Sequence, residues 1–313
     1  MSTWDRRYAD RVQLLVDILP MLGREPRFAL KGGTAINLFE HDLPRLSVDI
    51  DLAWLPVHDF NQDSALIADS LETLAGLLRA PPLRLQVQLS GSQGARGITR
   101  LVVSRDRARV QIETSPVMRG TVHPVREMEV TPQVEEAFGF AFVQVLAFAD
   151  LYAGKLAAAL TRQHPRDLFD IGLLLQDARA DATLWRTFLV YLTCSPKPAW
   201  EMLAPREPEN FEAIFNTHFR GMTAVPTSTS GLLETRAQLL AWISGWLDES
   251  SRDFLRSVES EQPDFGLIGL PRAQALPGVR RKLHNLSRRS QAKRQADRLQ
   301  LELTLAQVAE RVT

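Results

Sequence analysis

The chain has 313 residues, 45% of them hydrophobic and 24% charged, a composition that indicates a folded globular protein and excludes a disordered one. Its 37 basic and 37 acidic residues balance, but the segment Arg280–Arg298 holds eight bases against one acid, so a basic patch is set against an acidic remainder. No apolar run approaches the roughly 20 residues of a membrane span, and the single cysteine, Cys194, excludes an internal disulfide and favours a cytoplasmic protein.

The first part of the chain alternates expected helices and strands. Apolar residues at helical spacing predict a helix over residues 4–22, and the short apolar run 27–30 predicts a buried strand. The glycines of Lys31-Gly-Gly-Thr-Ala35 predict a turn, and a helix is expected directly after it, over 34–40. Pro44 then prevents the helix from continuing.

Residues 46–55 form the next expected element, and polar and apolar side chains alternate along its first seven residues. Ser47, Asp49 and Asp51 share one face, and apolar residues occupy the other, which predicts a half-buried strand. Further expected elements are a helix over 59–78 and strands over 83–89, 98–104, 109–113 and 125–130. These elements predict an α/β (α+β) fold with a mixed sheet.

From residue 146 onward the pattern is helical. Helices are expected over 146–160 and 166–176, separated by His164-Pro165. Proline-rich segments near 194–208 indicate a boundary. A chain of this length suits two domains, so we expect one domain over 1–190 and a mainly helical one over 191–313, which contains the basic segment 280–298.

Ser47-Val-Asp49-Ile-Asp51 carries the sharpest chemical signal. Carboxylates at i and i+2 of a strand point to the same side, with backbones roughly 6.5–7 Å apart, and like charges so close repel each other. A divalent cation such as Mg²⁺, or Mn²⁺ in its place, would remove the repulsion, because it takes oxygen ligands and leaves positions for phosphates. For a bare D-x-D, a solvated strand face is the alternative interpretation.

The glycine turn lies about fifteen residues before these acids. Gly32, Gly33 and Thr34 stand between a strand and a helix, where backbone N–H groups and the helix dipole can bind a phosphate. An ordinary strand–helix turn is the alternative. Glu113 stands at the end of the later strand expected over 109–113, where it is either a further carboxylate ligand or a solvated strand-end acid.

Four sequence blocks together resemble the AbiEii/AbiGii-type toxin nucleotidyltransferases, a family of the polymerase β-like nucleotidyltransferase superfamily. The blocks are Lys31-Gly-Gly-Thr-Ala-Ile-Asn-Leu38, Arg45-Leu-Ser-Val-Asp-Ile-Asp-Leu52, Asp150-Leu-Tyr-Ala-Gly-Lys155 and Arg166-Asp-Leu-Phe-Asp170. They cover about residues 30–175 in the order of the family. No such motif follows residue 190.

The resemblance implies a role for each block. Asp49 and Asp51 would hold one or two metal ions that bridge the phosphates of an NTP. Ser47 and the backbone of the glycine turn would contact phosphate oxygens, and Lys155 would reach the triphosphate as a point charge.

Three acids and one arginine have less definite roles under the same resemblance. Asp167 would be a base for the acceptor hydroxyl or would orient Lys155, and Asp170, one helical turn away, is an alternative match. Glu113 would complete the metal site in those members that have a third ligand. Arg45 would either bind phosphate or pair with Asp42.

The implied function is that of the toxin in a bacterial toxin–antitoxin pair. It would transfer a nucleotide from an NTP to an RNA acceptor, the 3′ end of tRNA, and so block translation; a cognate antitoxin is the implied partner. Two alternatives stay open: the same chemistry on a small molecule, such as an aminoglycoside, or on a protein, and a non-catalytic nucleotide- or RNA-binding module. The basic segment 280–298 is either a contact for nucleic acid or a solvated helix face.

Overall fold

The computed structural model describes residues 6–91 and 97–310 and divides into two compact units. One unit comprises Met1–Ala147 with Phe219–Pro226, and the other comprises Phe148–His218 with Thr227–Thr313. The units separate earlier in the chain than the boundary at 190 expected from the sequence. The reason is that the helix beginning at Phe148 packs on the helices that follow it.

A mixed sheet forms the centre of the first unit. Over the described residues it has seven strands in the order β3-β4-β5-β2-β1-β7-β6. The strands are β1 (Phe28–Lys31), β2 (Asp49–Trp54), β3 (Gln86–Ser90), β4 (Arg100–Arg105), β5 (Ala108–Arg119), β6 (Arg126–Glu129) and β7 (Phe142–Val145). The pairs β2–β5 and β1–β7 are parallel, and the other neighbours are antiparallel. The expected α/β class with a mixed sheet is confirmed.

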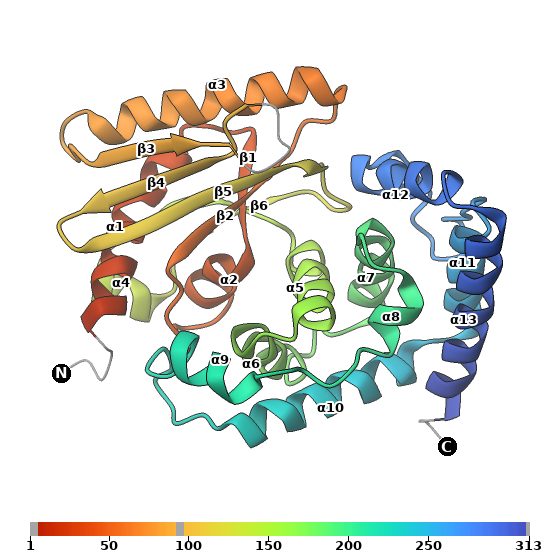
Figure 1. Ribbon diagram of the computed structural model, residues 1–313. Helices are drawn as coiled ribbons and strands as arrows, with labels where there is room; N and C mark the ends of the chain where they lie inside the picture. The colour runs from red at the N-terminus through yellow and green to blue at the C-terminus, as the bar shows by residue number, and fades with distance from the viewer. Residues whose placement is uncertain (1–5, 92–96, 311–313) are drawn as a thin grey trace. The chain divides into compact units, whose positions relative to one another are not determined.

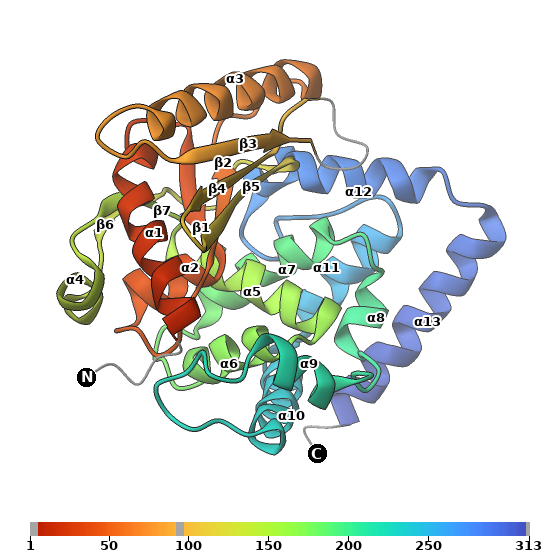
Figure 2. The same ribbon diagram turned by 60° about the vertical axis from the view of Figure 1, so that its left-hand side comes forward.

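Two long helices cover one face of this sheet, α1 (Arg6–Leu22) and α3 (Phe60–Arg79) (Figures 1 and 2). Trp54 of β2 points toward that face, where its indole Nε1 donates to Asp63 of α3 at 3.1 Å. Side chains alternate along a strand, so the acids of β2 point to the opposite face. The sheet thus separates the apolar face covered by α1 and α3 from the face that carries Asp49 and Asp51.

Short helical segments complete the unit. The helix expected over 34–40 is present as α2 (Gly32–Ala35), which continues as a π-helix, η1 (Ile36–Glu40). Another short helix, α4 (Pro132–Phe138), precedes β7. π-Helical turns are rare and occur frequently at functional sites, and this one directly follows the glycine turn.

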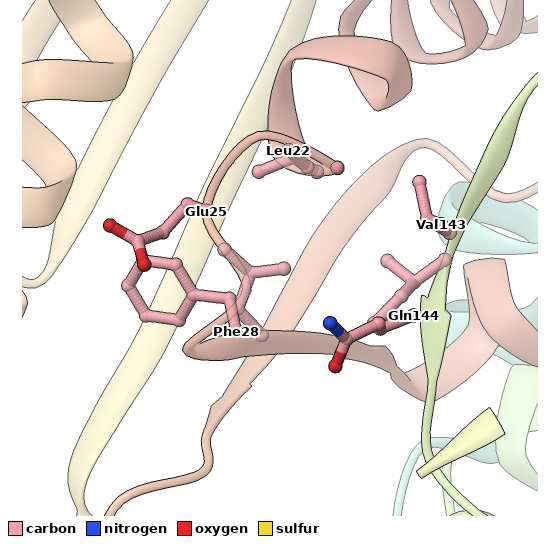
Figure 3. A pocket seen from close by; sticks show the side chains of 8 residues that line it. Leu22, Glu25, Phe28, Val143 and Gln144 are labelled. Atoms are coloured by element: carbon pink, nitrogen blue, oxygen red, sulfur yellow. The ribbon is translucent and has the colours of Figure 1, made fainter. Parts of the chain in front are cut away.

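A small cavity lies on the helix-covered face of the sheet (Figure 3). It is lined by the end of α1, including Leu22, and by Phe28, Leu30, Leu52 and other side chains. It has room for about one water molecule, and Leu52 faces away from the acids of β2. This cavity is therefore not a nucleotide site.

Helices make up the second unit over its described residues (Figure 1). They are α5 (Phe148–Arg162), α6 (Pro165–Leu174), α7 (Ala182–Cys194), α8 (Ala199–Leu203), α9 (Phe211–His218), α10 (Thr229–Trp246), α11 (Glu249–Glu259), the 3₁₀-helix η2 (Pro271–Ala275), α12 (Pro277–Ser287) and α13 (Gln291–Glu310). Helix α5 packs on α6 and α7, and buries Tyr152, Leu156 and Leu160. The helical C-terminal region is confirmed.

None of the helices in the described ranges is long and apolar enough to cross a membrane.

Candidate active site

The two acids of β2 lie where the sequence pattern predicts, on the face opposite α1 and α3. Asp49 and Asp51 are half-exposed, and Ile50 between them is fully buried. Asp51 is in register with Lys31 of β1 on one side and Glu113 of β5 on the other. Within the described ranges, no hydrogen bond or ion pair engages the Asp51 carboxylate. It is therefore accessible to a ligand.

The glycine turn lies directly against Asp51. Gly32 has φ +75°, and a Cβ atom there would lie 2.5 Å from Asp51 Oδ2. A Cβ atom on Gly33 would lie 2.7 Å from Arg45 Nη2 and 3.1 Å from Ser47 Oγ. A side chain at either position would displace these polar groups, and the positive φ of Gly32 further favours glycine there. The backbone of the turn is therefore held close to the groups that the sequence assigns to phosphate and metal.

Thr34 fastens the turn to the strand. Its buried hydroxyl donates to the main-chain carbonyl of Asp49 at 2.5 Å, and a hydrogen bond of 3.0 Å joins it to Ser47 Oγ. Asn37 Nδ2 reinforces the turn by donating to the Gly33 carbonyl at 2.9 Å. Thr34 thus fixes the position of the D-x-D strand relative to the start of α2.

Arg45 is a buried cation beside the turn, only 2% exposed. Its Nη1 donates to the Leu46 carbonyl at 2.9 Å, and its Nη2 is the atom closest to the space above Gly33. Asp42, the alternative partner considered from the sequence, accepts from the backbone N–H of Gln133 at 2.9 Å. The guanidinium therefore contributes positive charge next to Gly33 and Ser47.

Glu113 is engaged elsewhere. Its carboxylate forms an ion pair with Arg100 and accepts from Gln111 Nε2 at 2.5 Å. No group of three or more metal-ligating side chains comes together within residues 6–91 and 97–310. In the structure, the expected third ligand is therefore not assembled with the pair on β2.

The pair itself fits a divalent metal. Both groups are carboxylates on one face of a strand, they are half-exposed, and the carboxylate of Asp51 is not engaged by a described residue. Hard oxygen donors with open positions beside them suit Mg²⁺ and Mn²⁺. The donor set agrees with the metal chemistry expected from the sequence.

A second cluster of charged residues lies in the helical unit. Lys155 Nζ on α5 contacts Asp167 Oδ1 at 3.0 Å and Asp170 Oδ2 at 2.9 Å, both on α6. The three side chains are nearly or fully buried, with at most 6% exposed. The sequence left open which acid accompanies Lys155, and in the structure both do.

Arg162 is a member of this cluster that the sequence analysis missed. Its guanidinium holds Asp167 through two bonds, Nε to Oδ2 at 2.6 Å and Nη2 to Oδ1 at 3.0 Å. Burial acts to raise the pKa of the Asp167 carboxyl, but Lys155 and Arg162 outweigh it and hold that pKa well below its usual range. A carboxylate with so little tendency to take up a proton is suited to orienting Lys155 rather than to acting as a base.

His164 starts the helix that carries the acids. Its Nδ1 accepts from the backbone N–H of Arg166 at 3.1 Å, so it caps α6. Burial, and next the nearby Arg166, lower the pKa of His164 to about 4. The helix dipole at this N-terminus also favours the ionised form of Asp167 in the first turn. The scattered spacing of the histidines gave no sign of this role.

Comparison with known proteins places the chain in a family. The model of the family described as nucleotidyl transferase AbiEii toxin, type IV toxin–antitoxin system, matches residues 13–283. No curated protein matches the chain. Among solved structures, the chain is similar to MenT4, a nucleotidyltransferase toxin from Mycobacterium tuberculosis H37Rv, with a TM-score of 0.59 and 16% identity over 89% of this chain and 93% of that one.

The likeness to MenT4 shows a shared fold, since its sequence identity is low. The family match covers most of the chain and includes the glycine turn, the D-x-D strand and the Lys155 cluster. The resemblance seen in the four sequence blocks is thus confirmed. This chain belongs to the AbiEii family of nucleotidyl transferase toxins of type IV toxin–antitoxin systems, and it is a nucleotidyltransferase.

Proposed function

We propose that the protein transfers a nucleoside monophosphate from an Mg²⁺-bound NTP to an RNA acceptor, the 3′ end of tRNA, and thereby blocks translation in the bacterial cytoplasm. Membership of this family implies an NTP substrate, a divalent metal and an antitoxin partner. The observation that carries the proposal is the approach of the glycine turn to the half-exposed Asp51 carboxylate.

In this proposal Asp49 and Asp51 would hold the metal, and when bound it would supply positive charge to neutralise the triphosphate. Backbone N–H groups of Gly32, Gly33 and Thr34 and the hydroxyl of Ser47 bind phosphate oxygens. An oxygen of the acceptor RNA attacks the α-phosphorus, the bond to the bridging oxygen breaks, and pyrophosphate leaves. The proton of the acceptor hydroxyl passes to solvent.

Lys155 belongs to the helical unit and is assigned to the triphosphate, where it would act as a point charge. This role requires its buried ammonium to release Asp167 or Asp170, with which it is paired in the structure. Asp167 is a positioning residue in this proposal, because Arg162 and Lys155 already occupy both of its oxygens. Asp170 holds the same ammonium from the other side.

Glu113 is assigned a conditional role as a metal ligand. It joins Asp49 and Asp51 only after it releases Arg100 and Gln111. In a Glu113→Gln variant the side-chain amide oxygen can still accept the hydrogen bond from Gln111, but the negative charge of the carboxylate is removed. A smaller loss of transfer in this variant than in Asp51→Asn is the result expected from a secondary ligand.

The proposal is tested by incubating the purified protein with total bacterial RNA, Mg²⁺ and each α-³²P-labelled NTP in turn, beside an Asp49→Ala variant. The expected result is a labelled band of tRNA size that is absent with the variant, and the labelling NTP names the nucleotide. Label on material that resists RNase would instead favour a protein or small-molecule acceptor. Absence of label with all four NTPs would favour a binding module and overturn the proposal.

A further inference from the structure

The basic segment 280–298 contains cations with different surroundings, and one of them is structural. Lys282 is buried on α12, where its Nζ donates to the carbonyls of Ser195 and Lys197 at 2.8 and 2.6 Å. These carbonyls follow the end of α7, so Lys282 caps that helix end and fixes α12 to α7. Its charge is used inside the protein.

Three further cations of the segment are paired with acids. Arg289 Nη1 and Lys293 Nζ both bind the buried Asp297, at 2.7 and 2.8 Å, and Arg294 binds Glu261 at 3.1 Å. These pairs fix the start of α13. They leave little charge for a partner.

The other four cations of the segment are arginines, and all of them are exposed: Arg280, Arg281, Arg288 and Arg298. No carboxylate within the described ranges pairs with any of them. Three belong to α12 and its C-cap, with Arg281 and Arg288 seven residues, or two helical turns, apart. Arg280, Arg281 and Arg288 are called the α12 arginine face below.

We propose that the α12 arginine face binds the phosphate backbone of the acceptor RNA, an inference that rests on the proposed function. Guanidinium groups bind phosphate through paired hydrogen bonds, and arginines without an acid partner keep their full charge for it. Val279 and Leu286 of α12 are buried, and the exposed positions around the arginines carry polar side chains, including His284 and Asn285. A face without exposed apolar residues does not suit insertion into a membrane.

The position of α12 within the helical unit supports this inference. Helix α12 packs on α7, and α7 packs on α5, which carries Lys155. The buried Lys282 makes the first of these contacts specific. RNA held by the arginine face is therefore held by the same packed unit that presents Lys155.

The test measures binding of purified bulk bacterial tRNA by a variant with R280Q, R281Q and R288Q, across a series of salt concentrations. The matched control carries R84Q, R107Q and R206Q, which neutralise three exposed arginines without an acid partner in the described residues. We expect the arginine-face variant to bind tRNA about tenfold or more weakly. The slope of log affinity against log salt should fall by about 2 to 3, because one phosphate contact contributes slightly less than one to that slope.

An unchanged affinity and salt slope, or equal losses in the control variant, would overturn the inference. So would selective loss of binding to phosphatidylglycerol–phosphatidylcholine vesicles with tRNA binding intact. Circular dichroism and the urea midpoint check that the variants fold. The labelling assay is read separately: wild-type protein that binds tRNA through this face but transfers no nucleotide refutes the proposed function and leaves the RNA contact standing.

Discussion

Gly32 and Asp51 are so close that no side chain fits between them: a Cβ atom on Gly32 would lie 2.5 Å from Asp51 Oδ2. The positive φ of Gly32, +75°, adds a backbone strain of about 1–2 kcal/mol for any other residue. We expect Gly32→Ala to lower the free energy of unfolding by at least this amount and to reduce nucleotide transfer more than tenfold, because the carboxylate must move.

Gly139 provides the matched control for this change. It also has a positive φ, +99°, but a Cβ atom added there would meet nothing within 4 Å. Gly139→Ala should be destabilised in urea unfolding, yet transfer nucleotide at the wild-type rate. Equal losses of transfer in the two variants would mean that strain alone, and not the approach to Asp51, explains the result.

Replacing Asp51 with Asn separates catalysis from stability. The substitution removes one of two like charges on the strand face, so the free energy of unfolding should stay the same or rise by a few tenths of a kcal/mol. Transfer should fall at least about a hundredfold, since a metal ligand is lost, and Mn²⁺ binding measured by electron paramagnetic resonance should weaken. The control Asp106→Asn, at an exposed hairpin turn, should leave nucleotide transfer and Mn²⁺ binding unchanged. Full activity of Asp51→Asn would exclude the metal role.

Asp167 should make the protein sensitive to acid. Its pKa is held below its usual range in the folded protein, with burial opposing and Lys155 and Arg162 causing the shift. The folded state therefore gains stability from the ionised carboxylate above the unfolded pKa of about 3.9, and loses it as the pH falls toward the lower folded pKa. In urea titrations, the stability difference between wild type and Asp167→Asn should be largest at neutral pH and shrink below pH 4. A constant difference down to pH 2 would contradict the ion pair.

The sequence predicted the centre of the first unit because its signals are local. Alternation along residues 46–52 defines a strand face, and the glycines mark a turn, so Gly32, Ser47, Asp49 and Asp51 were placed without knowledge of the sheet. Strand β7 was missed. It is only four residues long, and its partner Leu30 lies more than a hundred residues away in the chain, so no local pattern predicts the pairing.

Long-range ion pairs were equally inaccessible to the sequence. Whether Glu113 faces Asp51 or Arg100 depends on the pairing of β4 with β5, which places Arg100 opposite Glu113. The sequence could not decide whether Asp167 or Asp170 accompanies Lys155, because both carboxylates contact the same ammonium. Partners of the basic segment include Glu259 of α11, Glu261 just after that helix, and the carbonyls of Ser195 and Lys197 after α7. The exposed arginines could therefore be separated from the paired ones only in three dimensions.

His164 gives a second and separate pH effect. Burial, followed by Arg166, lowers its pKa to about 4 in the folded protein, below the unfolded value of about 6.5. The unfolded state thus binds more protons between these two values, and stability must fall as the pH drops from 6.5 to 4. The cap is consistent with this direction, since Nδ1 accepts from the N–H of Arg166 and a proton on it would break that bond.

Replacing His164 with Asn tests this effect, because Asn keeps a capping acceptor without a titrating group. The variant should reduce the loss of stability over this pH range, on the order of 1–2 kcal/mol after solvent screening, as measured by urea unfolding at half-unit pH steps. His284→Asn, at an exposed position of α12, is the control and should keep the wild-type profile. If His164→Asn retains the wild-type slope between pH 4 and 6.5, another group is responsible for the acid sensitivity of α6.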